Sequence, residues 1–541
     1  MEQAQQNEHK GIDSNLTSGI HSSYWIDSLP ALQFMPLEGS IETDVVIVGG
    51  GMAGISIAYQ LTRQGKKVVV IEDGDIGSGE TGRTTAHLAT ALDDRYYELE
   101  RIFGKEGARY AAESHRTAID IIEQTIQYES ISCDFERVTG YLFLHPSDQE
   151  ASLQKEYAAA REAGLDVELL DAAPGLSRSG RCLAFANQAQ FHPLKYLHGL
   201  CQAITANGGQ LFTATKAVEI DHTGVVTDQG FRVDAAFVVV ATNTPVNDRY
   251  VMHLKQFAYR TYVIGGLVAK DAIPHALWWD TGDFKANANI PPYHYVRLQS
   301  YDETHDLLIC GGEDHATGLA FAQHITDEER YRQLECWARE KFDITEIIYR
   351  WSGQVMEPMD SLAYIGRNPA DKDNVFIVTG DSGNGMTHAT IASLLIPDLI
   401  QGNVNKWKKI YDPQRFKFFR SGKTWLKEFA GGLFRYMREY PYDADAVELS
   451  SIGQGGGKIV ELGNSKYGVH RDEEDDLHVV AAECTHLHCI VQWNNDEQSW
   501  DCPCHGSRFT YKGKVINGPA NKDLFYYREK APETSTRIGS K

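Results

Sequence analysis

Two short segments near the C-terminus carry cysteine and histidine side chains at metal-ligand spacing. Cys484 and His486 lie in the first segment, Cys502 and His505 in the second, and fifteen residues separate the pairs. Two thiolates and two imidazoles can hold a [2Fe–2S] centre in which histidines replace two cysteines, or a zinc ion. The Cys-x-His spacing and an additional cysteine in each segment favour the iron–sulfur centre over zinc.

Both segments resemble the cluster-binding loops of Rieske proteins, and the resemblance extends over about residues 444–524. It implies that Cys484 and Cys502 hold the buried iron. It also implies that His486 and His505 hold the outer iron, nearer to solvent or to a redox partner.

Further residues fit the same resemblance. Gly518-Pro519-Ala520 corresponds to the loop that caps the cluster, and Ser507 to a hydroxyl that hydrogen-bonds a cluster sulfide. The resemblance also implies a disulfide between Cys489 and Cys504. Such bonds are rare in the cytosol, but the metal would hold both sulfurs within bonding range. The disulfide therefore does not require an extracellular location.

Two positions depart from the Rieske pattern. His488 stands where a glycine is usual, and we interpret it as a surface residue rather than a ligand. Phe509 stands where high-potential members often have a tyrosine. Because losing a hydrogen bond near the cluster lowers its potential, we predict a value in the middle of the Rieske span of roughly −150 to +300 mV. Voltammetry checks this value, and a result at the top of the span contradicts it.

A second chemical motif lies near the N-terminus. Residues 44–48 read as a buried strand, and Gly49-Gly50-Gly51-Met52-Ala53-Gly54 follows at once. Residues 55–63 have helical spacing, and a second apolar strand over 67–71 ends at Glu72. This β-α-β unit with a G-x-G-x-x-G turn predicts a dinucleotide whose pyrophosphate lies at the helix N-terminus and whose ribose is bound by the acidic residue.

Three more segments indicate FAD rather than NAD. They are the hydroxyl-rich residues 77–87, the strand and turn at 237–243, and the strand, glycine loop and helix start at 374–387. With the first motif they resemble FAD-dependent amine and amino-acid oxidoreductases, such as D-amino-acid, glycine and sarcosine oxidases, over about residues 44–402. In that family the last glycine loop faces the flavin, and a helix N-terminus there stabilises the anionic reduced ring. Asn243 replaces a glycine that is usual in the family.

The resemblance implies FAD contacts distributed over the whole region. The expected contact residues are Gly49, Gly51, Met52, Ala53, Gly54, Glu72, Arg83, Thr84, Thr85, Val218, Thr242, Gly383, Gly385, Met386 and Thr387.

The elements that position a substrate are strand-like segments between 257 and 311. The resemblance implies that they form an antiparallel sheet over the flavin, inserted into a Rossmann-like α/β FAD-binding fold of the glutathione-reductase type. Alternation places Tyr293, Tyr295 and Arg297 on one face and His294 on the other. Arg297 could bind a substrate carboxylate, or it could belong to an ordinary sheet face with a salt bridge.

Two further segments are substrate-site candidates. Arg260 with Tyr262 could likewise bind a substrate or belong to an ordinary sheet face, and the turn at 311–315 could reach the site or be structural. His87 follows the segment expected near the flavin, and it could link FAD covalently, act without a covalent bond or be structural. The catalytic candidates are thus His87, Tyr295 and Arg297.

Composition limits the function classes. The 541 residues predict three or four domains, and 52 basic against 74 acidic residues give a net charge of −22, which argues against nucleic-acid binding. No apolar run reaches membrane-spanning length, and the N-terminus lacks a signal-peptide pattern, so we expect a cytoplasmic protein. Residues 406–438 are basic and aromatic, which indicates either docking on the protein itself or contact with an anionic surface or redox partner.

We therefore expect the following domain organisation. It comprises an N-terminal extension (1–40), an FAD-dependent oxidoreductase domain (41–405) with substrate-domain insertions at about 130–190 and 255–345, a basic aromatic linker (406–442), a small all-β Rieske domain (443–530) and a tail (531–541).

The predicted activity is that of a dehydrogenase. A C–H bond next to nitrogen in a small amine or amino acid would give a hydride to FAD. The electrons would then pass through the cluster to an external quinone, cytochrome or ferredoxin-like acceptor. The alternatives are electron flow from cluster to flavin, or an electron-transfer or redox-sensing protein without a substrate. Rieske oxygenase chemistry is disfavoured because the carboxylate expected before His192 and His198 is absent, and position 189 is alanine.

Overall fold

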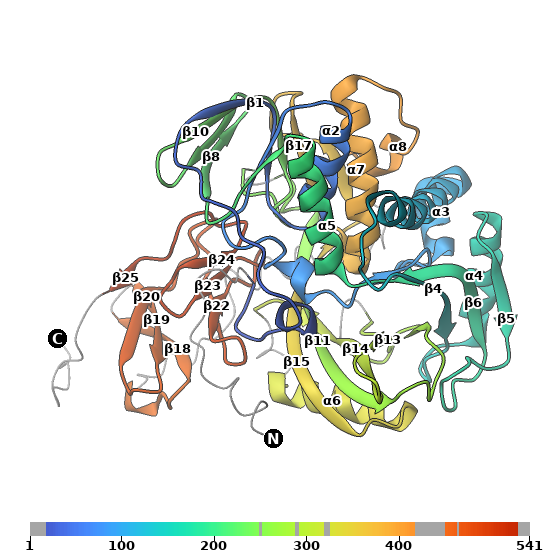
Figure 1. Cartoon of the computed structure of the whole chain (residues 1–541). Coiled ribbons are helices and arrows are strands. Elements are labelled where there is room, and N and C mark those ends of the chain that lie inside the picture. The colour runs from blue at the N-terminus through green and yellow to red at the C-terminus, as the bar shows by residue number, and fades with distance from the viewer. Residues whose placement is uncertain are drawn as a thin grey trace.

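The computed structural model describes residues 18–247, 251–286, 291–318, 325–416, 449–462 and 465–527. Two large mixed sheets with their helices make up the first four-fifths of the chain, and two small antiparallel sheets form the C-terminal domain (Figure 1). Most of the residues predicted to form the basic linker, and the whole predicted tail, lie outside the described residues.

The first sheet is the predicted nucleotide-binding sheet, with strand order β16-β17-β10-β1-β2-β7. Its central strands run parallel and are rich in Val and Ile that are buried on both faces, as expected for a sheet covered by helices. Its strands are β1 (Ile41–Val48), β2 (Val68–Ile71), β7 (Gln210–Phe212), β8 (Ala217–Asp221), β9 (Gly224–Thr227), β10 (Arg232–Val240), β16 (Tyr364–Arg367) and β17 (Val375–Thr379).

Helices α2 (Met52–Arg63), α5 (Pro193–Ala206) and α7 (Gly385–Gln401) cover one face of this sheet. Helix α2 packs between α5 and α7, and α3 (Tyr96–Glu129) packs on α7 (Figure 1). The N-termini of α2 and α7 are the two sites at which the sequence predicted glycine loops.

The second sheet has strand order β15-β11-β14-β13-β12-β4-β6-β3, with β5 paired to β6. Helix α6 (Asp327–Lys341) packs on β11 and β14, and α4 (Glu150–Glu162) packs on α3. The strands are β3 (His87–Leu88), β4 (Glu136–Phe143), β5 (Val167–Leu170), β6 (Cys182–Gln190), β11 (Gln256–Ala269), β12 (Leu277–Asp280), β13 (Tyr295–Ser300), β14 (His305–Ala316) and β15 (Glu346–Pro358).

Residues 311–315, which were predicted to form a turn, instead continue strand β14. Gly311, Gly312 and His315 pair with β11, and Gly311 also pairs with β13, so these non-local partners extend the strand past its glycines.

The C-terminal domain has two sheets, β18-β19-β20-β25 and β21-β22-β23-β24. Trp500 and Phe509 lie buried between them with the cluster cysteines. The strands are β18 (Gly457–Leu462), β19 (Ser465–Arg471), β20 (Leu477–Ala481), β21 (Gln492–Asn494), β22 (Ser499–Asp501), β23 (Arg508–Thr510), β24 (Val515–Asn517) and β25 (Tyr526–Tyr527).

The N-terminal segment joins the domains. Its short helix α1 (Tyr24–Asp27) is anchored by the buried Trp25, whose Nε1 donates to the Thr84 carbonyl at 2.6 Å. Just before it, the Ile20 amide donates to Glu497 of the C-terminal domain at 2.8 Å.

The described start of the basic segment docks on its own chain. Lys406 pairs with Glu113 at 2.6 Å, and Arg415 is buried against Asp360 at 2.7 Å. This agrees with the self-docking alternative for residues 406–416, which include α8 (Lys408–Tyr411). Among the described residues, no helix has the length and apolar character needed to cross a membrane.

Candidate flavin cavity and iron–sulfur site

One cavity of about 780 Å³ runs along the carboxyl edge of the first sheet. Its walls come from the glycine turn before α2, from η1 (Glu80–Arg83), from the loop before α7 and from the second sheet. The C-terminal domain also contributes to the wall, through residues between Val515 and Asn521, which we term the cap segment.

The glycine turn forms a cradle without side chains. Gly49 has φ +110°, and a Cβ there would lie 2.5 Å from the Ala241 carbonyl oxygen. A Cβ on Gly54 would lie 1.9 Å from the Gly49 oxygen, and Gly51 is the N-cap of α2. The amides at this helix start, of which that of Met52 donates to Thr81 Oγ1 at 3.0 Å, therefore border a space that can hold a pyrophosphate, as FAD requires.

Glu72 stabilises the same turn. Its carboxylate accepts hydrogen bonds from the Gly50 amide and, at 3.0 Å, from the Gly74 amide. Burial, reinforced by Asp73, raises the pKa of Glu72 well above its ordinary value. The side chain also lines the cavity, where a ribose would meet it.

The cavity wall contains most of the expected FAD contacts: Gly49, Gly51, Met52, Ala53, Glu72, Arg83, Thr84, Thr85, Thr242, Gly383, Gly385 and Met386. Three others do not line it. Gly54 packs beneath the turn, and Lys216 and Ala217 line the wall instead of Val218. The Thr387 hydroxyl bonds to His115 at 2.8 Å and to the Asn384 carbonyl, which places it inside α7.

Asn243, which replaces the usual glycine, adopts a backbone conformation that glycine favours. Its φ of +62° lies in the left-handed region, which asparagine tolerates better than other non-glycine residues. The turn therefore keeps a glycine-like backbone and still lines the cavity.

His87 and Tyr295 lie on the cavity wall with their rings edge to face. Both ring nitrogens of His87 have partners, Thr85 Oγ1 at 3.0 Å and the Val296 carbonyl at 3.2 Å. Burial, followed by the charge of Arg297, lowers the pKa of His87 to about 3, so the imidazole is neutral at physiological pH.

Arg297 does not line the cavity, so its prediction as a carboxylate-binding residue is wrong. Its guanidinium is fully buried and donates to the carbonyls of Ala86 and Phe191 at 3.0 and 2.9 Å and to the Gln299 side chain. A buried guanidinium must satisfy its donors, and here the neighbouring backbone does so.

Arg260 is also directed away from the cavity. It is buried and pairs with Glu497 of the C-terminal domain at 2.9 Å, while Tyr262 donates to Asp327. Arg260 therefore joins two domains and is not available to a substrate.

Two carboxylates line the cavity wall and can contact a substrate, whereas Arg260 and Arg297 do not line it. Nothing in the sequence pointed to Asp93, and Asp314 belongs to segment 311–315, for which a place in the site was one of two alternatives. Burial raises the pKa of Asp93 to about 6 and that of Asp314 to about 7. No local motif marks Asp93, because it becomes a wall residue only when its loop meets the Gly383 loop.

The predicted iron ligands come together in the C-terminal domain. The Cys484 and Cys502 side chains are buried and interact with each other, and the His486 and His505 rings lie 5.0 Å apart. The buried Nδ1 of His505 has no hydrogen-bond partner among the described residues. An unsatisfied imidazole nitrogen next to two thiols fits a metal ligand, so the donor set fits a [2Fe–2S] cluster.

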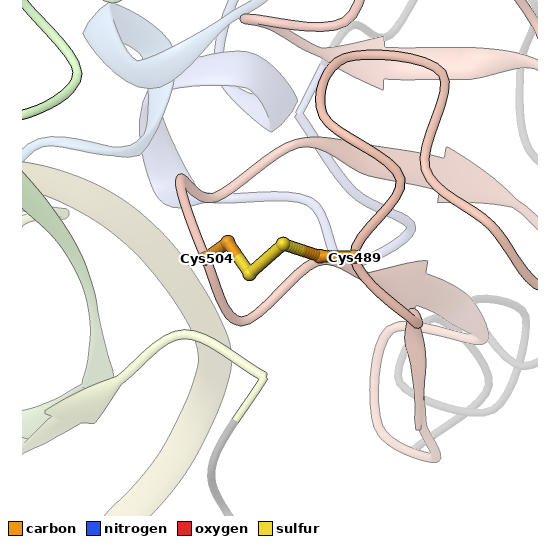
Figure 2. The surroundings of a disulfide bond; sticks show 2 residues. All are labelled: Cys489 and Cys504. Atoms are coloured by element: carbon orange, nitrogen blue, oxygen red, sulfur yellow. A yellow bond between two sulfur atoms is a disulfide. The ribbon is translucent and has the colours of Figure 1, made fainter. Parts of the chain in front are cut away.

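The expected disulfide between Cys489 and Cys504 is present and joins the two loops (Figure 2). The buried Ser507 hydroxyl accepts from the Ala520 amide at 3.0 Å, which fastens the cap segment to the second loop. His488 has a side chain that is 79% exposed and a φ of +60°, so a glycine-like conformation persists there on the surface.

The cluster-bearing domain is bonded directly to the flavin cavity. Gln354 Nε2 on β15 donates to the Gly506 carbonyl at 3.0 Å, and Asn517 Nδ2 donates to Glu80 at 3.1 Å. Glu80 in turn accepts from the Gln354 amide at 2.7 Å. These bonds connect the second cluster loop, the cap segment and the cavity wall.

Substituting Gly54→Val is expected to abolish FAD binding, because even one Cβ would overlap the Gly49 carbonyl and displace the cradle. Flavin absorption after purification measures the effect. Gly39→Ala in the segment before β1 is the control, since Gly39 has no left-handed φ and a Cβ there meets nothing within 4 Å. Full flavin content in the Gly54→Val variant contradicts the assignment.

Comparison with known proteins agrees with this architecture. Residues 44–399 match the family model for FAD-dependent oxidoreductases, and residues 444–528 match the Rieske [2Fe–2S] domain. A Bacillus subtilis (strain 168) Rieske 2Fe-2S iron-sulfur protein, YhfW, is 31% identical over 93% of this chain and 96% of its own.

Two further similarities concern the FAD part. Escherichia coli (strain K12) gamma-glutamylputrescine oxidoreductase is 27% identical over 74% of this chain and 94% of its own. The crystal structure of glycine oxidase from Geobacillus kaustophilus has a TM-score of 0.56 at 18% identity, covering 69% of this chain and 99% of that one. This likeness concerns the fold.

Proposed function

Because this chain belongs to the FAD-dependent oxidoreductase family and carries a C-terminal Rieske [2Fe–2S] domain, we propose that it is a dehydrogenase of a small amine or amino acid. It oxidises a C–N bond and passes the electrons through the cluster to an external acceptor. When bound, FAD supplies a two-electron acceptor for the substrate, and the cluster supplies a one-electron carrier.

The observation that carries this proposal is that one cavity is walled by both domains. The glycine cradle and the cap segment of the Rieske domain line the same space. Glu80 accepts from Asn517 on one side and from the Gln354 amide on the other, and so it holds the cap segment over the cavity wall. Such proximity supports direct electron transfer between the two cofactors.

The residues of the chain prepare the substrate end. Tyr293, Tyr295 and Trp279 supply aromatic walls that exclude water. His87 is held neutral between Thr85 and Val296, so it adds no positive charge next to an amine. The name of the gamma-glutamylputrescine oxidoreductase, a relative similar along most of its own length, supports a C–N bond as the target.

Anaerobic stopped-flow absorption tests the proposal. The holoenzyme is mixed with members of a panel of amines and amino acids. The absorption of the flavin and that of the cluster are recorded in the same experiment. We expect bleaching by at least one member of the panel, followed by cluster reduction. Absence of bleaching by the whole panel, with cluster reduction by an added reductase that then reduces the flavin, contradicts a dehydrogenase and supports the reverse direction or a redox-sensing role.

A further inference from the structure

Two hydroxyl–carboxylate pairs line the cavity, one from the loops that precede α3 and β13 and one from the neighbouring strands β11 and β14. Tyr293 hydrogen-bonds to Asp93. Thr261 hydrogen-bonds to Asp314, and its hydroxyl also lies 2.6 Å from that of Tyr295. The two tyrosine rings are 5.4 Å apart, so the pairs form one acidic and aromatic wall.

This wall meets the glycine loop before α7. A Cβ on Gly383 would lie 1.9 Å from Asp93 Oδ2 and 2.9 Å from the Tyr293 hydroxyl. Asp314 Oδ1 is buried and has no hydrogen-bond partner among the described residues. An ionised carboxylate oxygen without a donor is costly, and the site therefore has an unmet need for a cation or a hydrogen-bond donor.

The charges around Asp314 also favour the binding of a cation. Asp93 and Glu313 are acidic, and both raise its pKa, while His294 is the opposing charge and is itself bonded to Asp280 and Glu313. On the cavity wall, Arg83 pairs with Glu497. Arg95, whose charge lowers the pKa of Asp93, donates to the carbonyls of Leu92 and Asp280.

We propose that Asp314, together with Asp93 in the same wall, binds an ammonium group of the substrate. The substrate is then an organic amine whose recognition does not require an α-carboxylate. This rests on the proposed function and narrows it from amines and amino acids to amines. Aromatic walls and carboxylates are the surroundings that organic cations favour.

A matched pair of small probes tests the site by binding alone. Butylamine and butyrate have similar chains and opposite charges, and flavin difference spectra of the holoenzyme report their dissociation constants. We expect butylamine to perturb the spectrum and butyrate not to do so. Asp314→Asn should weaken butylamine about tenfold or more, since a hydrogen bond to a charged group is lost. Asp171→Asn, whose side chain is 96% exposed, is the control.

The outcomes separate the two proposals. Perturbation by butyrate instead of butylamine, or equal butylamine affinity in Asp314→Asn, overturns the cation site even if amino acids bleach the flavin. Butylamine binding that is lost in Asp314→Asn supports the site even if no compound is oxidised, in which case only the dehydrogenase proposal fails. Flavin content and circular dichroism of the variant exclude misfolding.

An independent observation concerns the contact between the domains. His253, which precedes β11 and is 3% exposed, has its ring centroid 4.7 Å from that of His486 and 5.8 Å from that of His505. The two predicted ligands of the outer iron are therefore covered by an imidazole of the FAD domain.

Neighbouring contacts support the same docking. A Cβ on Gly506 would lie 2.3 Å from the Ala258 Cβ, so the backbone of the second cluster loop lies directly on β11. A Cβ on Gly318, which follows β14, would lie 2.9 Å from the Pro503 Cα. The cluster end of the Rieske domain is thus seated on the FAD domain.

We infer that His253 is a positioning residue, which holds the two ligand imidazoles against the FAD domain for electron transfer from the flavin. His253→Phe should slow cluster reduction about tenfold after substrate or photochemical flavin reduction, and should change the electron paramagnetic resonance spectrum and midpoint potential of the cluster. The rate of flavin reduction should stay unchanged. His253→Gln should retain part of the rate of cluster reduction that His253→Phe loses. His222→Phe on an exposed turn is the control.

An unchanged spectrum, potential and rate in His253→Phe overturn this inference. A slower rate with an unchanged potential and spectrum also overturns it, because disturbed docking elsewhere would then account for the loss. Iron content shows that the cluster is intact. Photochemical reduction keeps the test separate from the identity of the substrate.

Discussion

Replacing Glu497 with glutamine is expected to lower the free energy of unfolding by about 3–5 kcal/mol, the range observed when one partner of a buried ion pair is removed. The substitution keeps the size of the side chain but removes the charge that three buried arginines face. Thermal unfolding followed by circular dichroism measures the difference.

The geometry explains the size of this effect. Glu497 is fully buried in the turn between β21 and β22, and its carboxylate lies 2.9 Å from Arg260, 3.7 Å from Arg83 and 4.0 Å from Arg508. It also accepts from the Ile20 amide. One carboxylate thus joins the N-terminal segment, the FAD domain and the Rieske domain, and its loss leaves buried positive charges that repel one another.

The pH dependence has a definite sign. Burial alone would raise the pKa of Glu497, but the charges of Arg83 and Arg260 hold it well below its ordinary value of 4.5. Its stabilising contribution is therefore complete above about pH 4.5 and declines as pH falls toward the lower pKa of the folded state. The difference in unfolding midpoint between the wild type and Glu497→Gln should narrow below about pH 4.5.

Glu474→Gln, an exposed carboxylate of the same domain, is the matched control and should leave the unfolding midpoint unchanged. If Glu497→Gln unfolds at the wild-type midpoint, the carboxylate does not hold the domains together.

Substituting Cys502→Ser is expected to remove the [2Fe–2S] cluster almost completely while FAD stays bound. Cys502 is 1% exposed and interacts with Cys484, and its sulfur lies within 4.8 Å of both sulfurs of the disulfide. A serine hydroxyl is a poor substitute for a thiolate on iron. The glycine cradle belongs to a different sheet, so flavin retention is expected.

Iron content, the paramagnetic resonance signal and flavin absorption together measure this result. Substrate should still bleach the flavin in Cys502→Ser, but transfer to a one-electron acceptor that depends on the cluster should stop. Cys336→Ser, at an exposed cysteine, should keep both cofactors. Wild-type iron content in Cys502→Ser would falsify the ligand assignment.

The sequence by itself determined the cofactors, because both are bound by short, contiguous motifs. The Cys-x-His and Cys-x-x-His pairs each lie within one loop, and the glycine turn joins one strand directly to one helix. Within each motif only a few backbone dihedral angles separate the binding groups, so the spacing of the residues largely sets the geometry of binding. Asn243 and His488 show the same locality, for each keeps the left-handed backbone of the glycine that it replaces.

The tertiary structure alone decided which charged residues face the cavity. Arg297 and Tyr295 share a strand face, yet only the tyrosine lines the wall, because the arginine reaches carbonyls from segments more than a hundred residues away. Arg260, Glu497 and His253 acquire their roles only where the two domains meet. The partner of a buried charge is set by packing between distant segments, and periodicity within one segment carries no information about it.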